Sequence, residues 1–360
     1  MSSTTWNGSS STDWATGANW STGSPPTTGA HVVIPDTSSI NNCVLDQTRT
    51  IGSLTIQANG TLVGGGFTLN ITSEGDASGG TEHFAVNNDG IISGELNLNI
   101  TTAATTSCDF AGSTGKFHDV TINHASCQVN LESTTQFTGN LNITLGKMVC
   151  GGNTVEITGR TDIGPASGSA DQATLQCDAS AMFLGSGRTS SYALIVNQGG
   201  TFTGGSGNHT IGSIETKNNS NAKCTLTSGV TTIDGENASD NYALSIEAAS
   251  TFDDGNGTIT ITFAGSSRIR FNSKPVYNLI INHASATIEY VGATTIDNDL
   301  TVTAGIFRYN SFNNLTVTGN VSVTGTLGHT NVSTTSNSTF GSLTINSGGT
   351  FLAPSGTTTI

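Results

Sequence analysis

The sequence predicts an all-β protein whose fold is a right-handed parallel β-helix, a β-solenoid in which each coil stacks on the one before it. Two observations lead to this prediction. The first is that near-copies of one strand-turn unit recur along the chain. The second is that apolar and polar residues alternate in short runs, while no helical period persists for more than a few residues. A third observation, the gathering of all three tryptophans near the N-terminus, predicts a cap at that end.

The N-terminal region, residues 1–35, is expected to form this cap, and residues 36–360 a continuous repeat array. Trp6, Trp14 and Trp20 supply a large aromatic surface in the cap region. A plug of this kind would cover the first coil, whose strand edge would otherwise be open to aggregation. A second interpretation is that these tryptophan rings are exposed and stack on the sugar rings of glycans.

Internal repeats run through the chain. One pair of similar segments is FHDVTINHAS at 117–126 and VYNLIINHAS at 276–285. A second pair is YALIVNQGGTFTGG at 192–205 and YALSIEAASTFDDG at 242–255. Equivalent strands are spaced by roughly 18 to 25 residues, which suits the coils of a parallel β-helix better than propeller blades. An all-β sandwich is the main competing fold, but sandwiches rarely contain such copies. His124 and His283 hold the same place in their repeats, which predicts a turn role in which the imidazole bonds local backbone.

Period-2 alternation marks the strands. It is expected to place Leu141, Ile143 and Leu145 on one face, with polar residues on the other. Glycine and asparagine punctuate these segments, because both tolerate the positive φ angles of tight corners. Asparagine is also expected to stack in ladders along the solenoid, where its amide groups would be satisfied between coils.

Six cysteines occur without any C-x-x-C pair. Three successive gaps from Cys108 to Cys177 resemble one coil each, so we expect these thiols to stack inside as small apolar residues. Disulfides or a metal site are the alternative. The full set is Cys43, Cys108, Cys127, Cys150, Cys177 and Cys224.

Composition narrows the functional classes. The net charge is −14, and the 11 Lys and Arg residues form no cluster in the sequence, so nucleic-acid binding is not expected. No apolar run is long enough to span a bilayer, so membrane insertion is not expected either. The seven histidines form no zinc motif, and no phosphate-binding or nucleophile motif is complete, so the sequence predicts no cofactor and no metal.

One acidic pair is a weak catalytic candidate. Asp253 and Asp254 precede Arg268 and Arg270 by about one coil, and carbohydrate-cleaving sites use paired carboxylates. Adjacent residues in a strand point to opposite faces, however, and the DDGNG segment is typical of a turn. A structural turn is therefore the preferred interpretation, with a polysaccharide lyase or hydrolase as the alternative function.

A family resemblance rests on the opening of the chain. The pattern W-x-G, D-W, N-W, P, V-x-I-P, followed by repeats of the GSLTI type, resembles the start of many large β-helical surface proteins. These are autotransporter-like adhesins and fibre or appendage proteins of marine phages. The resemblance implies a location on a virion surface or at the cell surface. The N-terminus carries no charged and apolar leader segment, so assembly onto a virus particle is one expected route to the outside.

Together these features predict a non-enzymatic structural or adhesive shaft, in the first place a phage fibre or appendage protein, with a secreted bacterial adhesin as the alternative. The expected partners are neighbouring structural subunits, as a homo-oligomeric trimer or filament, and host-surface glycans. The array stops at GGTFLAPSGTTTI without a polar cap, so we expect the chain either to continue or to dock there on another subunit.

Overall fold

The computed structural model describes residues 2–76, 83–165, 172–309, 313–329 and 336–360. It divides into two compact units: unit 1 comprises residues 1–165 and 172–176, and unit 2 comprises residues 166–171 and 177–360. Strands and turns account for nearly all of both, and the described residues include one short 3-10 helix, Gly17–Asn19. Within the described ranges, no helix is long and apolar enough to cross a membrane.

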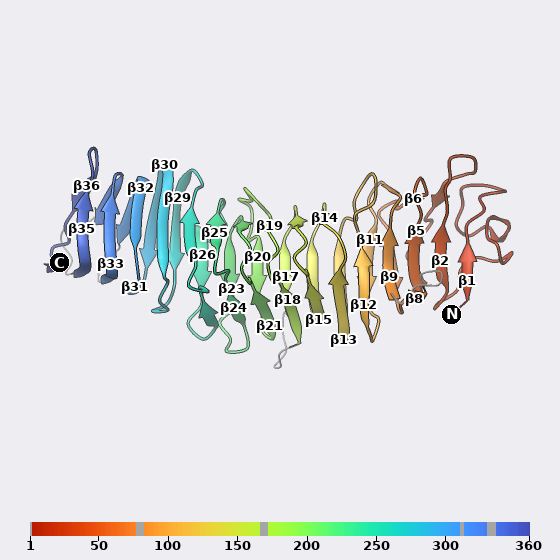
Figure 1. The fold of residues 1–360 in the computed structure, drawn as a ribbon, viewed down its shortest axis with the longest axis horizontal. Coiled ribbons are helices and arrows are strands. Elements are labelled where there is room, and N and C mark those ends of the chain that lie inside the picture. Colours follow the sequence, from red (N-terminus) through yellow and green to blue (C-terminus); the bar gives the residue numbers. More distant parts are fainter. Residues whose placement is uncertain (1, 77–82, 166–171, 310–312, 330–335) are drawn as a thin grey trace. The chain divides into compact units, whose positions relative to one another are not determined.

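Unit 1 holds the strands coloured from red to yellow-green in Figure 1. Its strands are β1 (Ser3–Thr5), β2 (His31–Ile34), β3 (Cys43–Val44), β4 (Arg49–Ile51), β5 (Ser53–Ile56), β6 (Thr61–Val63), β7 (Thr68–Ile71), β8 (Gly75–Asp76), β9 (His83–Asn88), β10 (Ile91–Ser93), β11 (Asn97–Ile100), β12 (Thr105–Asp109), β13 (Val120–Leu131), β14 (Thr135–Phe137), β15 (Leu141–Val149), β16 (Val155–Ile157), β17 (Thr161–Ile163) and β18 (Ala173–Gln176).

Unit 2 holds the strands coloured from green to blue (Figure 1). Its strands are β19 (Met182–Leu184), β20 (Leu194–Val196), β21 (Gly200–Thr203), β22 (His209–Ile211), β23 (Ile214–Thr216), β24 (Lys223–Thr225), β25 (Val230–Ile233), β26 (Tyr242–Ile246), β27 (Thr251–Asp253), β28 (Thr258–Ile261), β29 (Gly265–Arg270), β30 (Asn278–Val291), β31 (Thr294–Ile296), β32 (Leu300–Tyr309), β33 (Leu315–Val323), β34 (Thr326–His329), β35 (Ser338–Ile345), β36 (Thr350–Leu352) and β37 (Thr358–Thr359).

Strand pairing confirms the predicted parallel β-solenoid. In unit 1, β4, β7, β11, β13, β15 and β17 pair in parallel succession, each one coil after the last. In unit 2, β22, β25, β28, β30, β32, β33 and β35 do the same. Among the named strands that the structure describes, β8 and β9 alone pair antiparallel. A β-sandwich would require hairpins throughout, so this topology excludes it.

Apolar side chains line up from coil to coil in the interior. In unit 1, one inward row follows the strand register through Ile71, Ile100, Ile122, Ile143 and Ile163, all of which are buried. Each coil thereby removes the apolar surface of its neighbours from water, which contributes about 25 cal/mol for each Å² buried. Stability therefore accumulates between adjacent coils.

The INHAS segments, residues 122–126 and 281–285, interrupt this alternation. In both places the register shifts as the chain passes to the next face, between Ile122 and Asn123 in unit 1. One coil later, Leu145 is only half-buried while Gly146 faces inward. The prediction that Leu145 shares the buried face of Ile143 is therefore wrong, because a corner changes the phase of the strand.

The three tryptophans form one buried cluster. Trp6 and Trp14 each contact Trp20 edge to face, with ring centroids 4.9 and 4.8 Å apart. The indole N–H of Trp6 donates to the Asn41 carbonyl at 2.7 Å. All three rings are at most 1% exposed, so no ring face is open to a sugar, and the glycan-stacking interpretation of these residues is wrong.

The parallel strands begin inside the region predicted as a cap. β1 pairs with β2, and β2 with β5, so residues 3–5 and 31–34 already belong to the stacked array. The tryptophans lie on the segment between β1 and β2. They form the core of the connection between these two strands.

All six cysteines are buried free thiols, as predicted. Burial raises the pKa of Cys127 to about 11 and that of Cys224 to about 12, so both stay protonated and unreactive. The predicted stacking of successive thiols is wrong for Cys108 and Cys127. Cys108 aligns with Leu131, four residues beyond Cys127, because the coil is longer there than the cysteine spacing.

Candidate functional site

Asparagine and aspartate side chains join one coil to the next at a corner of unit 1. The Asn97 side chain accepts a hydrogen bond from the Asp119 backbone N–H at 3.0 Å. Asp119 accepts from the Asn140 N–H at 2.7 Å, and Asn140 from the Arg160 N–H at 2.8 Å. Donor and acceptor are 20 to 22 residues apart, which is one coil.

Unit 2 contains the same device. Two continuous runs lead from Asn278 through Asp299 to Asn320, and from Asn314 through Asn337 to Thr357, with bonds of 2.7 to 3.1 Å. The predicted asparagine ladder is thus present in both units, with aspartate sharing it. We call these bonds the Asn/Asp ladders. Each satisfies a backbone N–H that would otherwise lack a partner at the corner.

A glycine stands directly before the donor in several of these bonds. A Cβ added at Gly139 would lie 2.2 Å from Asp119 Oδ1, and one at Gly319 would lie 2.6 Å from Asp299 Oδ1. The ladder oxygen therefore occupies the space that any larger residue would need. Glycine followed by the donor, as in TGN at 138–140 and 318–320, is the sequence signal of a ladder.

The acidic pair at 253–254 belongs to this scaffold. The carboxylate of Asp254 accepts the Tyr277 N–H one coil later and the Asn256 N–H at 3.1 Å. Asp254 is only 8% exposed, and burial raises the pKa of its carboxyl. Asp253 is exposed and accepts the Gly255 N–H at 2.9 Å. Both carboxylates therefore hold the turn, and neither contacts Arg268 or Arg270.

The two repeat histidines bond their own corners. The Ser126 N–H donates to His124 Nδ1 at 3.2 Å, and the Ser285 N–H donates to His283 Nδ1 at the same distance. Both imidazoles lie on the outside of the coil and are half-buried.

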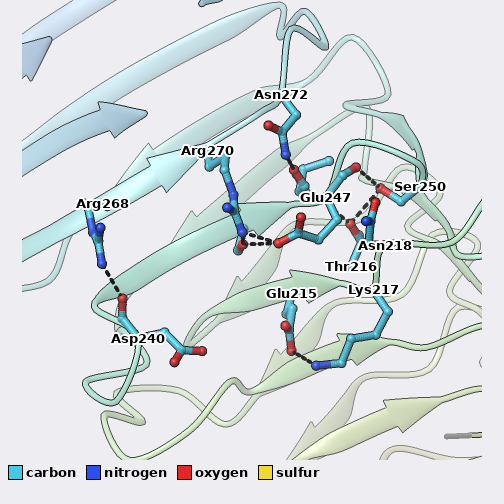
Figure 2. A network of polar contacts seen from close by, with 12 residues as sticks. Glu215, Thr216, Lys217, Asn218, Asp240, Glu247, Ser250, Arg268, Arg270 and Asn272 are labelled. Atoms are coloured by element: carbon cyan, nitrogen blue, oxygen red, sulfur yellow. Dashed lines mark hydrogen bonds and ion pairs between the residues drawn. The ribbon is translucent and has the colours of Figure 1, made fainter. Parts of the chain in front are cut away.

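Arg268 and Arg270 lie on one outward face of unit 2, shown in Figure 2, where Arg270 contacts Glu247. The strand register sets Glu215, Ser245 and Arg270 side by side on β23, β26 and β29. Arg270 forms an ion pair with Glu247 and donates to Ser245 Oγ at 2.7 Å. Glu215 pairs with Lys217 at 2.6 Å. We call this surface the charged face; it comprises Glu215, Lys217, Tyr242, Glu247, Arg268, Arg270 and Lys274.

Hydrogen bonds also join the turns of successive coils beside the charged face (Figure 2). Thr216 Oγ1 and Ser250 Oγ are 2.7 Å apart, and the Ala249 N–H donates to the Asn218 side chain at 3.0 Å. Lys274 Nζ donates to the Ala248 carbonyl at 2.9 Å. Partial burial lowers the pKa of Lys274, because desolvation disfavours its charged form. The polar network thus holds the turns in register.

Tyr242 is shared by two guanidinium groups. Arg268 lies 4.4 Å and Arg270 4.9 Å from the centroid of its ring. Arg268 Nη2 donates to the Asp240 carbonyl at 2.7 Å, and the Asp240 carboxylate accepts from the Asn237 side chain. Of the two guanidiniums, therefore, only Arg270 forms an ion pair within the described chain. Arg268 keeps its charge and is fixed in place by backbone carbonyls and the ring.

Sequence reasoning selected the arginines but missed Glu247. A usable signal lay in the repeat of residues 192–205 at 242–255: Glu247 stands where the first copy has Asn197, and Ser245 where it has Ile195. Both changes put polar groups beside Arg270. Glycoside hydrolysis needs a protonated carboxylic acid opposite a carboxylate, whereas Glu215 and Glu247 each contact a cation.

The described residues contain no group of three or more His, Cys, Asp or Glu side chains placed to hold a metal ion. Comparison of the chain with models of known protein families, with curated proteins and with solved structures finds no match. Function must therefore be inferred from the Asn/Asp ladders and the charged face.

Proposed function

We propose that the chain is a non-enzymatic structural and adhesive shaft, in the first place a component of a phage fibre or appendage displayed on the virion surface. The observation that supports this most is the Asn/Asp ladder, which recurs in both units and joins several successive coils. A ladder of this kind adds nothing to a catalytic centre. It adds resistance to separation of the coils.

Three kinds of bond act between adjacent coils. Parallel backbone pairing, inward apolar rows and the Asn/Asp ladders all run in the same direction, so a pulling force along the coils loads them together. In solenoids, stability is a sum of nearest-neighbour terms, and the coils therefore yield one at a time. A shaft with this construction spaces or displays whatever lies at its ends. Its partners would be neighbouring subunits, as a trimer or filament, and host-surface glycans.

A secreted bacterial adhesin would use the same construction. Polysaccharide cleavage is the competing function, because the charged face brings Glu215 and Glu247 to the same surface. If the chain were such an enzyme, the unmodified protein would release oligosaccharides from a broad polysaccharide panel. Release of sugar would contradict the proposal.

Single-molecule pulling from both ends of the chain tests the shaft. The expected trace is a series of force peaks separated by about 70 to 80 Å, the contour length released when one coil unravels. Asp299→Ala should lower the peaks of the coils that its ladder joins. Asp297→Ala is the matched control, because Asp297 is an exposed aspartate two positions away and outside the ladder. A smooth low-force extension without peaks would contradict the proposal.

A further inference from the structure

We propose that the charged face of unit 2 binds an acidic polysaccharide, with Arg268 and Arg308 as the residues that contact its anionic groups. The inference rests on the attachment part of the proposed function and names the class of ligand. Its starting point is the distribution of charge. Six of the 11 basic residues of an acidic chain fall between residues 217 and 308: Lys217, Lys223, Arg268, Arg270, Lys274 and Arg308.

The strand register extends the charged face by two coils. Arg268 on β29 aligns with Glu289 on β30, and Glu289 aligns with Arg308 on β32. The extended face then carries five cations, Lys217, Arg268, Arg270, Lys274 and Arg308, against four carboxylates, Glu215, Asp240, Glu247 and Glu289. This face is therefore positive in a protein whose net charge is −14.

Arg268 is held ready for an anion. Its guanidinium lies over the Tyr242 ring and bonds the Asp240 and Asn241 carbonyls, so its position is set without neutralising its charge. Arg270, on the same ring, already has Glu247 as a partner. Of the two guanidiniums on this ring, Arg268 is thus the one without an ion pair in the described chain. A preorganised guanidinium loses little conformational freedom when it binds a ligand.

Arg308 supplies the second contact. Its backbone pairs within the sheet, but its guanidinium is partly exposed and forms no ion pair or hydrogen bond with the described part of the chain. On the coil beyond, it aligns with Gly328, and the Leu352 side chain of the following coil lies against that glycine.

The spacing of the two arginines favours a polysaccharide. Arg268 and Arg308 lie two strands apart, which is about 10 Å because neighbouring strands are about 4.8 Å apart. Carboxylate or sulfate groups on alternate sugars of an extended chain repeat on this scale, and guanidinium groups bind both in a bidentate manner. Duplex DNA carries one negative charge for about every 1.7 Å of its axis, which is much closer than the separation of the two arginines.

Binding measurements on the full chain test this inference. Polygalacturonate offers carboxylates, heparin offers sulfates, dextran is the neutral control, and duplex DNA is a polyanion without the sugar spacing. We expect binding to polygalacturonate or heparin, with no binding to dextran and weaker binding to DNA. Arg268→Ala and Arg308→Ala should each weaken binding about tenfold or more, as the loss of a charge-assisted hydrogen bond implies.

Two further variants make the result specific. Arg160→Ala is the matched control, because Arg160 is an exposed arginine of unit 1 that pairs with Asp162, and it should leave the affinity unchanged. Arg268→Lys keeps the charge but loses the planar contact with Tyr242, so it should also weaken binding. Absence of binding to both acidic polysaccharides, equal binding to DNA, or equal affinity of Arg268→Lys and the unmodified chain would each overturn the inference.

The shaft and the ligand can fail separately. The pulling experiment needs no glycan, so normal force peaks with no polysaccharide binding would overturn only the assignment of the charged face. Binding without force peaks would overturn only the shaft.

Discussion

The INHAS corners of unit 1 and unit 2 share their backbone construction. In both, an imidazole accepts a hydrogen bond from the N–H two residues later, and the register shifts at the same place. In both, a glycine lies one coil on, where an added Cβ would be 2.5 Å from the His124 carbonyl oxygen or 2.4 Å from that of His283. The two corners therefore turn the backbone in the same way.

The side chains around the corners differ on both faces. Inward, the position of Cys150 in unit 1 corresponds to Tyr309 in unit 2, where the ring packs 6.0 Å from Tyr290. Outward, Val149 corresponds to Arg308. Backbone pairing and corners thus leave the side chains on either face free to vary. At this corner, unit 2 uses this freedom to place a tyrosine inside and an arginine outside.

The largest expected effect is in the interior. Tyr309→Ala should destabilise unit 2 by about 3 to 5 kcal/mol, as truncation of a buried aromatic usually does. Cys150→Ala at the corresponding place in unit 1 should cost only about 1 kcal/mol, because it removes a single sulfur atom. Hydrogen exchange resolved by unit would measure both. Equal losses of stability in the two variants would show that Tyr309 and Cys150 contribute alike to their interiors, which would contradict the proposed difference between the units.

Much of this architecture could be predicted from the sequence. Period-2 alternation and internal copies indicate stacked parallel strands, because only inward side chains need to be apolar. Buried thiols and an asparagine ladder follow from the same logic, since polar groups between coils must find partners. The fate of Leu145 could not be predicted, because the corner at 122–126 changes which residues face inward one coil later.

The candidate site was harder to predict. Arg268 and Arg270 could be selected as rare cations, but coil lengths decide which carboxylate lies beside them. Unequal coils bring Glu247 to Arg270 and leave Asp254 bonded to the Tyr277 backbone. From the sequence, the three tryptophans could either pack in the interior or bind a sugar on the surface. Only their burial in the structure distinguishes these two roles.

The glycine one coil beyond each corner should be nearly as sensitive as the interior. Gly146→Ala and Gly305→Ala should each cost about 2 to 3 kcal/mol, since both combine a positive φ with a clash against backbone oxygen. Gly292→Ala is the matched control: its φ of 93° is like the 94° of Gly146, but nothing lies within 4 Å of the added Cβ. It should cost about 1 kcal/mol. Thermal unfolding would measure all three, and a cost for Gly292→Ala equal to the others would remove the clash as their cause.

A pH effect is expected from the buried carboxyl group of Asp254. Burial raises the pKa of Asp254 above its usual 3.8, so the folded protein binds this proton more readily than the unfolded chain. The stability of unit 2 should therefore fall as pH rises from 3.8 through the raised pKa, and Asp254→Asn should remove that fall while keeping an acceptor for Tyr277. Unfolding measured below and above this range would show it. A pH dependence in Asp254→Asn as steep as in the unmodified chain, or steeper, would contradict the prediction.

The histidines should show the smallest and most nearly equal effects. His124→Ala and His283→Ala each remove one acceptor, but the Ser126 and Ser285 N–H groups are exposed and water can replace the imidazole. Each loss should therefore be about 0.5 kcal/mol in thermal unfolding. Equality matters more than size here: if one substitution were several times more costly than the other, the two corners would not be the same device. In that case the charged exterior of unit 2 would have to contribute to its corner, because the outward positions are where the two corners differ in charge.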